Sequence, residues 1–171
     1  MMSLRRFTVA LVAVILGSSL ALWGVAGGAS SGVVKPKAGS WKVTIVKGGT
    51  GSGTGGSFNV INVGFTVASN HAKVSRFAFS FTYSGPIKPP SGVCSGNGVT
   101  AATKSSAIKK RKFSTPSSTP WTGAGSATYH GVFDSARRAH GTAAFQVFIS
   151  GTGCQFSGTA NTGTVRWTAR R

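Results

Sequence analysis

The chain has 171 residues, and its 19 lysines and arginines stand against a single acidic residue, Asp134, so that the formal net charge is +18. Charged residues make up only 12% of the chain, whereas about 25% is usual for a soluble domain. One carboxylate side chain cannot form a carboxylate calcium site or supply the paired carboxylates of a glycosidase. The composition excludes those classes of site, and the length suits one domain with one core.

The N-terminus has the order of segments found in a secretory signal peptide. Two arginines precede an apolar stretch over residues 7–23, and small residues follow it. This stretch of 17 residues is shorter than the roughly 20 apolar residues that a spanning helix needs. We therefore predict a helical signal peptide over residues 1–29 that is cleaved after Ala29, with Ala26 as the second choice of site and an uncleaved anchor as the alternative. The residues around the two arginines favour the general export route over the twin-arginine route.

Export has consequences for the charge and for the cysteines. Cleavage removes two arginines and leaves 17 basic side chains and one acidic one, a formal charge of 17 − 1 = +16. In an oxidising compartment Cys94 and Cys154 are expected to form a structural disulfide, because their wide spacing gives no sign of a redox-active pair. The predicted location is extracellular or associated with the cell envelope, with no membrane span after cleavage.

The mature chain is predicted to begin with a flexible lead-in over residues 30–38, because nothing alternates there and Pro36 opposes strand pairing. The secreted domain is then predicted over residues 39–171. Its first strand follows the alternation of residues 41–46, which has the period of a half-buried strand.

A Gly-, Ser- and Thr-rich connection over residues 48–56 separates this strand from the next. Apolar residues alternate again from Phe58 to Val67, on both sides of a predicted kink at Asn62. The clearest strand runs from Val74 to Tyr83, where four aromatic side chains fall on one face and Arg76 falls on the other. Such an aromatic face is predicted to form a wall of the core.

The second half of the chain continues in the same way. A turn is predicted at Asn97-Gly98, and a β-hairpin is predicted with its polar turn over residues 134–141. A basic stretch over residues 104–113 fits neither class of element, and the last strand covers residues 165–169. Because helical periodicity is lacking beyond the signal, we predict an all-β fold, a single antiparallel β-sandwich or small β-barrel of about seven to nine strands.

Four further features are spread along this β region. They are a tryptophan in the first strand, a phenylalanine after the Gly-rich loop, two well-separated cysteines and a terminal Trp-x-Ala. With these features residues 39–169 loosely resemble small exported bacterial all-β domain proteins of unassigned function. The resemblance implies only an export-associated β domain and carries over no functional residue.

The remaining signal is positive charge, which attracts polyanions. Outside a cell these are wall and capsule polymers, acidic polysaccharides, membrane lipid headgroups and nucleic acid. Nucleic acid is less favoured, because the aromatic side chains are expected in the core rather than stacked on bases. The candidate polyanion-binding residues are Lys104, Lys109, Lys110, Arg111, Lys112, Arg137 and Arg138. An equal alternative is that these residues protect a strand edge and keep the protein in solution.

Catalysis is the weaker hypothesis. His130, Asp134 and His140 flank the predicted hairpin turn, where they could approach one another and a serine to form a hydrolase site. However, Gly-x-Ser-x-Gly is missing from the predicted secreted domain, residues 39–171, and an aspartate beside two arginines is more simply a turn residue. The histidines, including His71, lack the spacing of a metal site, and residues 48–56 lack the ending of a phosphate loop. We therefore expect a non-catalytic domain without a cofactor or metal; the alternatives are a secreted hydrolase and a purely structural exported protein.

Overall fold

The computed structural model describes residues 34–90, 92–115 and 119–171. The predicted signal peptide, its cleavage after Ala29 and residues 30–33 of the predicted lead-in lie outside these ranges. The described residues form strands and no helix, which confirms the all-β prediction. It follows that no described segment forms a helix able to cross a bilayer.

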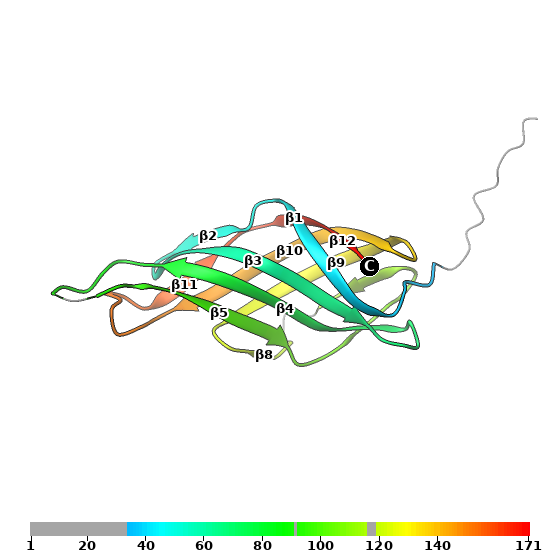
Figure 1. Ribbon diagram of the computed structural model, residues 1–171, viewed down its shortest axis with the longest axis horizontal. Coiled ribbons are helices and arrows are strands. Elements are labelled where there is room, and N and C mark those ends of the chain that lie inside the picture. Colours follow the sequence, from blue (N-terminus) through cyan, green and yellow to red (C-terminus); the bar gives the residue numbers. More distant parts are fainter. Residues whose placement is uncertain (1–33, 91, 116–118) are drawn as a thin grey trace, which may run out of the picture. The chain divides into compact units, whose positions relative to one another are not determined.

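Over the described residues, twelve antiparallel strands belong to one sheet (Figure 1). Their bounds are β1 Gly39–Lys47, β2 Thr50–Gly53, β3 Gly56–Val67, β4 Lys73–Ser84, β5 Ser95–Ala102, β6 Ser106–Ala107, β7 Lys112–Ser114, β8 Trp121–Thr122, β9 Gly125–Ser135, β10 Arg138–Ile149, β11 Gly158–Asn161 and β12 Val165–Arg170. This number exceeds the predicted seven to nine strands, because the prediction counted about one strand for each alternating pattern in the sequence. The excess arises because β2, β6, β7, β8 and β11 have only two to four residues each and are too short to show a pattern.

The order of hydrogen-bonded strands along the main path is β1-β12-β10-β11-β2-β3-β4-β5-β8. In addition β9 pairs with β10, β7 with β9, and β6 with β4. β1 pairs with β12 along one side and with β3 along the other. Both edges of the first strand are therefore hydrogen-bonded, and neither is open to strand addition over its paired residues.

The aromatic face of β4 forms a wall of the core, as predicted. Phe77, Phe79 and Phe81 are 0%, 1% and 2% exposed, whereas Arg76 on the opposite face is exposed. Tyr83 at the end of the strand is half-buried and packs against the same core. From Phe77 to Tyr83 the alternation in the sequence therefore assigned the faces correctly. It fails at Val74, which is buried although it lies two positions from exposed Arg76, because the register with β3 shifts around Arg76.

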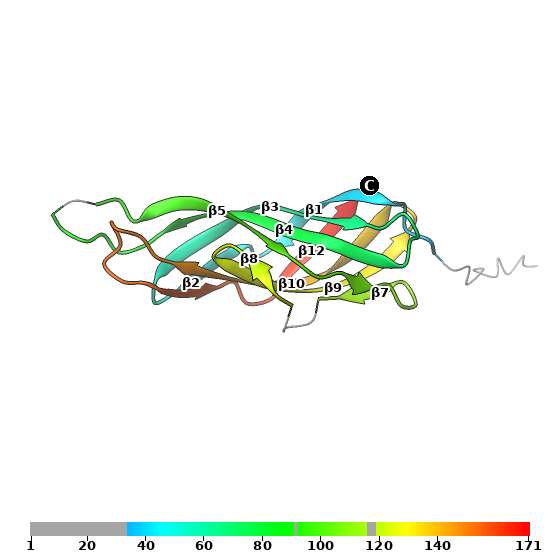
Figure 2. The same cartoon turned by 90° about the horizontal axis from the view of Figure 1, so that it is seen from below.

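The wall packs across the core against the β9–β10 hairpin. Phe77 stacks on Tyr129 of β9, and Phe79 meets the edge of Phe145 of β10, each with ring centroids 4.9 Å apart. Figure 2 shows the β3–β4–β5 part of the sheet lying over β9 and β10. These aromatic pairs hold the two parts of the sheet together and thereby position the outer face of β9 and β10, where the candidate site lies.

An irregularity in β3 matches the predicted kink. The register with β4 shifts between Val60 and Asn62, so that one residue is added to β3 as in a β-bulge. Val60 and Val63 are both buried as a result, although they are three positions apart. The kink thus keeps apolar residues of both halves of β3 on the core side.

One predicted turn was wrong, and the turn of the predicted β9–β10 hairpin is present but shorter than expected. Asn97-Gly98 lies inside β5, and the Gly98 position faces the ring of Phe81, which a Cβ atom at that position would approach to 2.5 Å. This glycine makes room for a core ring rather than a turn. The polar turn of the hairpin is also much shorter than residues 134–141, since β9 continues to Ser135 and β10 begins at Arg138.

Candidate functional site

The basic stretch that the sequence left unassigned contains a tight turn between β6 and β7. The backbones of Lys109 and Lys112 are joined by two hydrogen bonds of 2.8 and 2.9 Å. Lys110 and Arg111 between them have φ values of +47° and +68°, the left-handed region that a type I′ turn requires and that usually takes Asn and Gly. All four side chains are exposed. We call residues 109–112 the KKRK turn.

A second basic turn lies beside the KKRK turn. It joins β9 to β10 and carries Arg137 and Arg138, both exposed. β7 pairs with the end of β9, and the N–H of Phe133 donates to the carbonyl of Arg111 over 2.9 Å. The fold therefore brings together six of the seven candidate residues (109–112 and 137–138), while Lys104 lies apart in the connection between β5 and β6.

The sheet adds cations that the sequence did not single out. Arg170 of β12 pairs with Lys42 of β1 on one side and with Arg138 of β10 on the other. Four residue pairs further along, near the start of β12, Arg166 pairs with Lys47 of β1. These side chains are exposed, and they were missed because alternation along a strand does not reveal which strands are neighbours.

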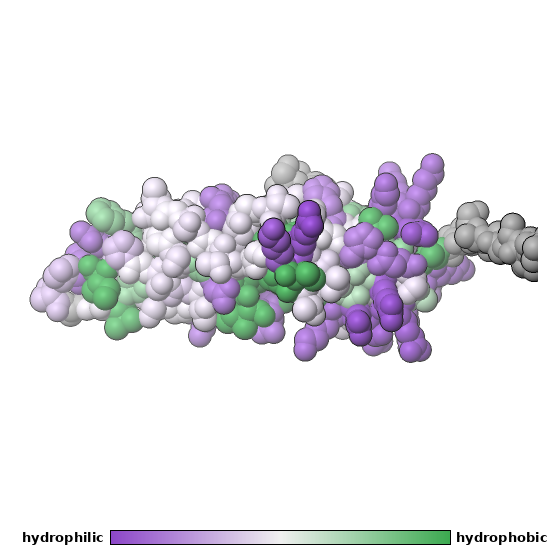
Figure 3. Space-filling model, turned by 90° about the horizontal axis from the view of Figure 1, so that it is seen from above, coloured by the Kyte–Doolittle hydropathy of each residue, from purple (hydrophilic) through white to green (hydrophobic). Residues whose placement is uncertain are grey.

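The positive charge is concentrated at one end of the sheet, where β1 begins, β12 finishes and both basic turns lie. We call this the basic end. In Figure 3 hydrophilic side chains crowd this end, and hydrophobic surface is more prominent toward the other. The exposed apolar residues Ile87, Val93 and Phe156 belong to the connections at that other end. The charge is thus gathered over particular elements rather than spread over the surface.

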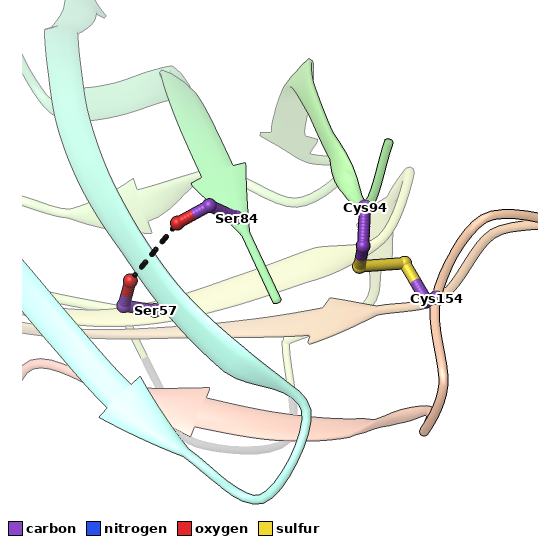
Figure 4. The surroundings of a disulfide bond; sticks show 4 residues. All are labelled: Ser57, Ser84, Cys94 and Cys154. Carbon is purple, nitrogen blue, oxygen red and sulfur yellow. Dashed lines mark hydrogen bonds between the residues drawn. A yellow bond between two sulfur atoms is a disulfide. The ribbon is translucent and has the colours of Figure 1, made fainter. Parts of the chain in front are cut away.

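The predicted disulfide is present at the end away from the basic turns. Cys94 and Cys154 are bonded, with their Cα atoms 4.5 Å apart, and they join the β4–β5 connection to the β10–β11 connection. Close by, the hydroxyls of Ser57 and Ser84 share a hydrogen bond of 3.3 Å between β3 and β4 (Figure 4). The disulfide fastens loops of the fold and lies away from the charged surface.

Near the basic end the outer face of the sheet is hollowed over β7, β9, β10 and β12. The hollow has a volume of about 1100 Å³. We call it the trough. The basic and imidazole side chains that line it are Lys109, Lys110, Lys112, His130, His140 and Arg166. Hydroxyl groups of Ser114, Thr142 and Thr168 line it as well.

Two paired glycines form the floor of the trough. Gly131 of β9 lies opposite Gly141 of β10. On the core side a Cβ atom at Gly131 would collide with the ring of Phe113, and one at Gly141 would approach Cζ2 of Trp167 to 2.5 Å. Phe113 and Trp167 are only 4% and 2% exposed. Both residues also line the trough, but their low exposure leaves almost no aromatic surface for a ligand there.

The only acidic side chain of the chain lies beside the trough. Asp134 occupies the irregular position near the end of β9, since Arg138 pairs with Ser135 and Ala139 with Phe133. Its carboxylate oxygens lie 2.8 and 2.9 Å from Nδ1 of His140. Because an ionised carboxylate only accepts hydrogen bonds, Nδ1–H of His140 is the donor and Nε2 is left for other partners.

His130 lies two residue pairs along the same hairpin. It pairs with Thr142, and His140 pairs with Val132, so the two histidines are diagonal neighbours with side chains about 7–8 Å apart. Among the hydrogen bonds of the described residues, none joins a serine hydroxyl to either histidine. Ser114 of β7 pairs with His130 in the sheet, but the described residues show no hydrogen bond that links a serine, a histidine and the carboxylate as in a hydrolase triad.

The third histidine lies on a different hairpin. His71 lies in the β3–β4 turn, with φ at +59°, and its Nδ1 is 2.7 Å from the carbonyl oxygen of Pro36. Over the described ranges no three His, Cys, Asp or Glu side chains come close enough to hold a metal ion.

The chain matches no protein-family model, no curated protein and no solved structure. The candidate surface is therefore interpreted from its own geometry and chemistry.

Proposed function

We propose that the protein is exported, loses residues 1–29, and acts as a secreted, non-catalytic β domain, a sandwich or small barrel, that associates with anionic polymers of the cell envelope or extracellular space. The observation that carries the proposal is the meeting of the KKRK turn, the β9–β10 turn and the cations of β12 at the basic end. Such a concentrated field attracts polyanions and gains binding free energy from released counterions.

The arrangement of the charge favours binding over a merely solubilising role. Solubility is served by dispersed charges, and a large field of one sign is unfavourable unless it serves attraction. Here Arg170 lies between Lys42 and Arg138 on adjacent strands, and like charges directly opposite one another destabilise a sheet. A polyanion would relieve this repulsion, whereas solubility would not require it.

The proposal is tested by two variants that remove the same charge. In the first, Lys110 and Arg137 become Gln; in the second, Lys88 and Lys104 become Gln. The first is expected to bind envelope preparations more weakly, and its slope of log affinity against log salt should fall by about 0.7–0.9 for each lost contact. The second variant should lose less affinity for the envelope preparations. Equal retention of both variants and the unchanged protein on envelope material would refute the proposal.

A second candidate function, a hydrolase, rests on one observation. Asp134 orients His140 beside His130, which resembles the base and orienting acid of hydrolase sites. It predicts that His130→Ala and His140→Ala each abolish an activity found by substrate screening without changing the thermal midpoint. Loss of activity in neither variant would leave association with polyanions, or a purely structural role, as the function.

A further inference from the structure

We propose that the trough binds a linear chain of phosphate groups, such as a polyol phosphate or inorganic polyphosphate. This inference rests on the proposed function and names the ligand and the site within the basic surface. Three features carry it: the kind and spacing of the donors, the lack of aromatic surface, and the placement of the single acid.

The donors of the trough lie across four neighbouring strands. Lys112 on β7 and Arg166 on β12 lie at its two sides, with His130 on β9 and His140 on β10 between them. Strands are spaced by about 4.8 Å, so three gaps place the outer cations roughly 14 Å apart. One phosphate cannot reach both sides at hydrogen-bonding distance. The trough therefore fits a ligand with several anionic groups in a row.

The polar side chains of the walls favour phosphate over acidic sugars or bases. Their ammonium, imidazole, hydroxyl and guanidinium groups all donate hydrogen bonds, which suits the many oxygen atoms of a phosphate chain. Nucleobases would stack on exposed rings, but Phe113 and Trp167 are buried beneath the floor. Sugar rings bearing carboxylates would likewise find no amphipathic aromatic surface to pack on. A flexible phosphate chain requires neither stacking on exposed rings nor packing against an aromatic surface.

The single acid has a role that simple charge attraction does not explain. A carboxylate near a polyanion site weakens attraction, yet the only acidic side chain of the sequence lies there. Its hydrogen bond to Nδ1 holds the His140 ring in one orientation, which leaves Nε2 to donate to a phosphate oxygen when the ring is protonated. Asp134 is thus a positioning residue for His140.

The first test compares two double variants of equal charge, Lys112→Gln with Arg166→Gln and Lys88→Gln with Lys104→Gln. Binding of inorganic polyphosphate and of poly(glycerol phosphate) is measured by calorimetry, with heparin, polygalacturonate and single-stranded DNA as comparison polymers. The trough variant should lose about tenfold or more of its affinity for the phosphate chains, and the control much less. The tighter of the two phosphate chains identifies the source. Equal losses in both variants would overturn the inference.

The second test uses Asp134→Ala and Asp134→Asn, which change the net charge equally. The asparagine amide oxygen still accepts from Nδ1–H of His140, whereas alanine does not. Asp134→Ala should therefore bind polyphosphate more weakly than Asp134→Asn, although both should bind heparin at least as tightly as the unchanged protein. Equal polyphosphate affinities in two variants of unchanged thermal midpoint would refute the positioning role. Should the alanine variant fail to fold, His140→Gln in the Asp134→Asn background should reduce polyphosphate binding, and unchanged binding would refute it.

The outcomes separate this inference from the proposed function. If the unchanged protein binds none of the polymers at low salt, both fail. If it binds all of them equally and the trough and control variants lose affinity alike, the proposed function stands and the phosphate site does not.

Discussion

Replacing Tyr129 by phenylalanine is expected to stabilise the protein. Tyr129 lies in β9, is 1% exposed, and packs between Phe77 at 4.9 Å and Phe145 at 5.6 Å. Its hydroxyl has no hydrogen-bond partner among the described residues. A buried hydroxyl without a partner costs about 1–3 kcal/mol. Phenylalanine keeps the ring contacts and removes this cost, so we expect a gain of about 1 kcal/mol at neutral pH.

The gain should grow at alkaline pH. Burial raises the pKa of Tyr129 well above its usual range, whereas the tyrosine of the unfolded chain ionises near pH 10. The unfolded state therefore loses a proton that the folded state keeps, and this favours unfolding. The contribution is absent below about pH 10, and above it the free energy of unfolding falls by about 1.4 kcal/mol per pH unit until the folded pKa is reached. The Tyr129→Phe variant has no hydroxyl to ionise at this position, so its free energy of unfolding does not fall for this reason.

The assay is urea unfolding of both proteins at neutral pH and at two values above about pH 10. Lysines deprotonate in both proteins, so their effect cancels in the difference between the two free energies of unfolding. Tyr83→Phe is the matched control, because Tyr83 is only half-buried, and its difference should stay small and constant. A Tyr129→Phe protein that is less stable at neutral pH, or a difference that does not grow above pH 10, would show that the hydroxyl is paired or hydrated.

Two further substitutions test the fold. Gly141→Ala should lower the free energy of unfolding by about 3 kcal/mol or more, because the added Cβ would collide with the carbonyl oxygen of His130 and approach Trp167. Gly64→Ala is the control, since the nearest contact of its Cβ would be the Trp41 carbonyl at 3.2 Å. Similar urea midpoints for the two variants would contradict the packing of the trough floor. The double variant Cys94→Ala with Cys154→Ala opens a loop of 60 residues and should lower the free energy of unfolding by about 4 kcal/mol. A stabilising disulfide would be ruled out if neither this variant nor reduction of the wild-type protein changed the thermal midpoint.

The sequence was sufficient for features that depend on neighbouring positions in one strand. The alternation of residues 77–83 revealed the core face of β4, because successive side chains of a strand point to opposite sides of the sheet. The change of phase near Asn62 revealed the bulge in β3. The disulfide was also predictable, because two cysteines allow only one pairing within the chain.

Local sequence signals gave wrong predictions where core packing or strand pairing required a different structure. Asn97-Gly98 is a strong turn signal, yet its glycine accommodates the ring of Phe81 within β5. The polar residues 134–141 looked like a loop, but cross-strand pairing continues through most of them. Two basic residues occupy the left-handed positions of the KKRK turn, where no residue preference would have indicated a turn.

Residue order alone was enough to predict the strand class, the core face of the clearest strand and the excess of positive charge. The place where that charge gathers depends on the pairing of distant strands. Arg166 and Arg170 join the basic turns because β12 pairs with both β1 and β10, and Asp134 reaches His140 because of the hairpin register. Alternation determines the face on which a side chain lies, whereas long-range packing of the whole core selects which strands become neighbours.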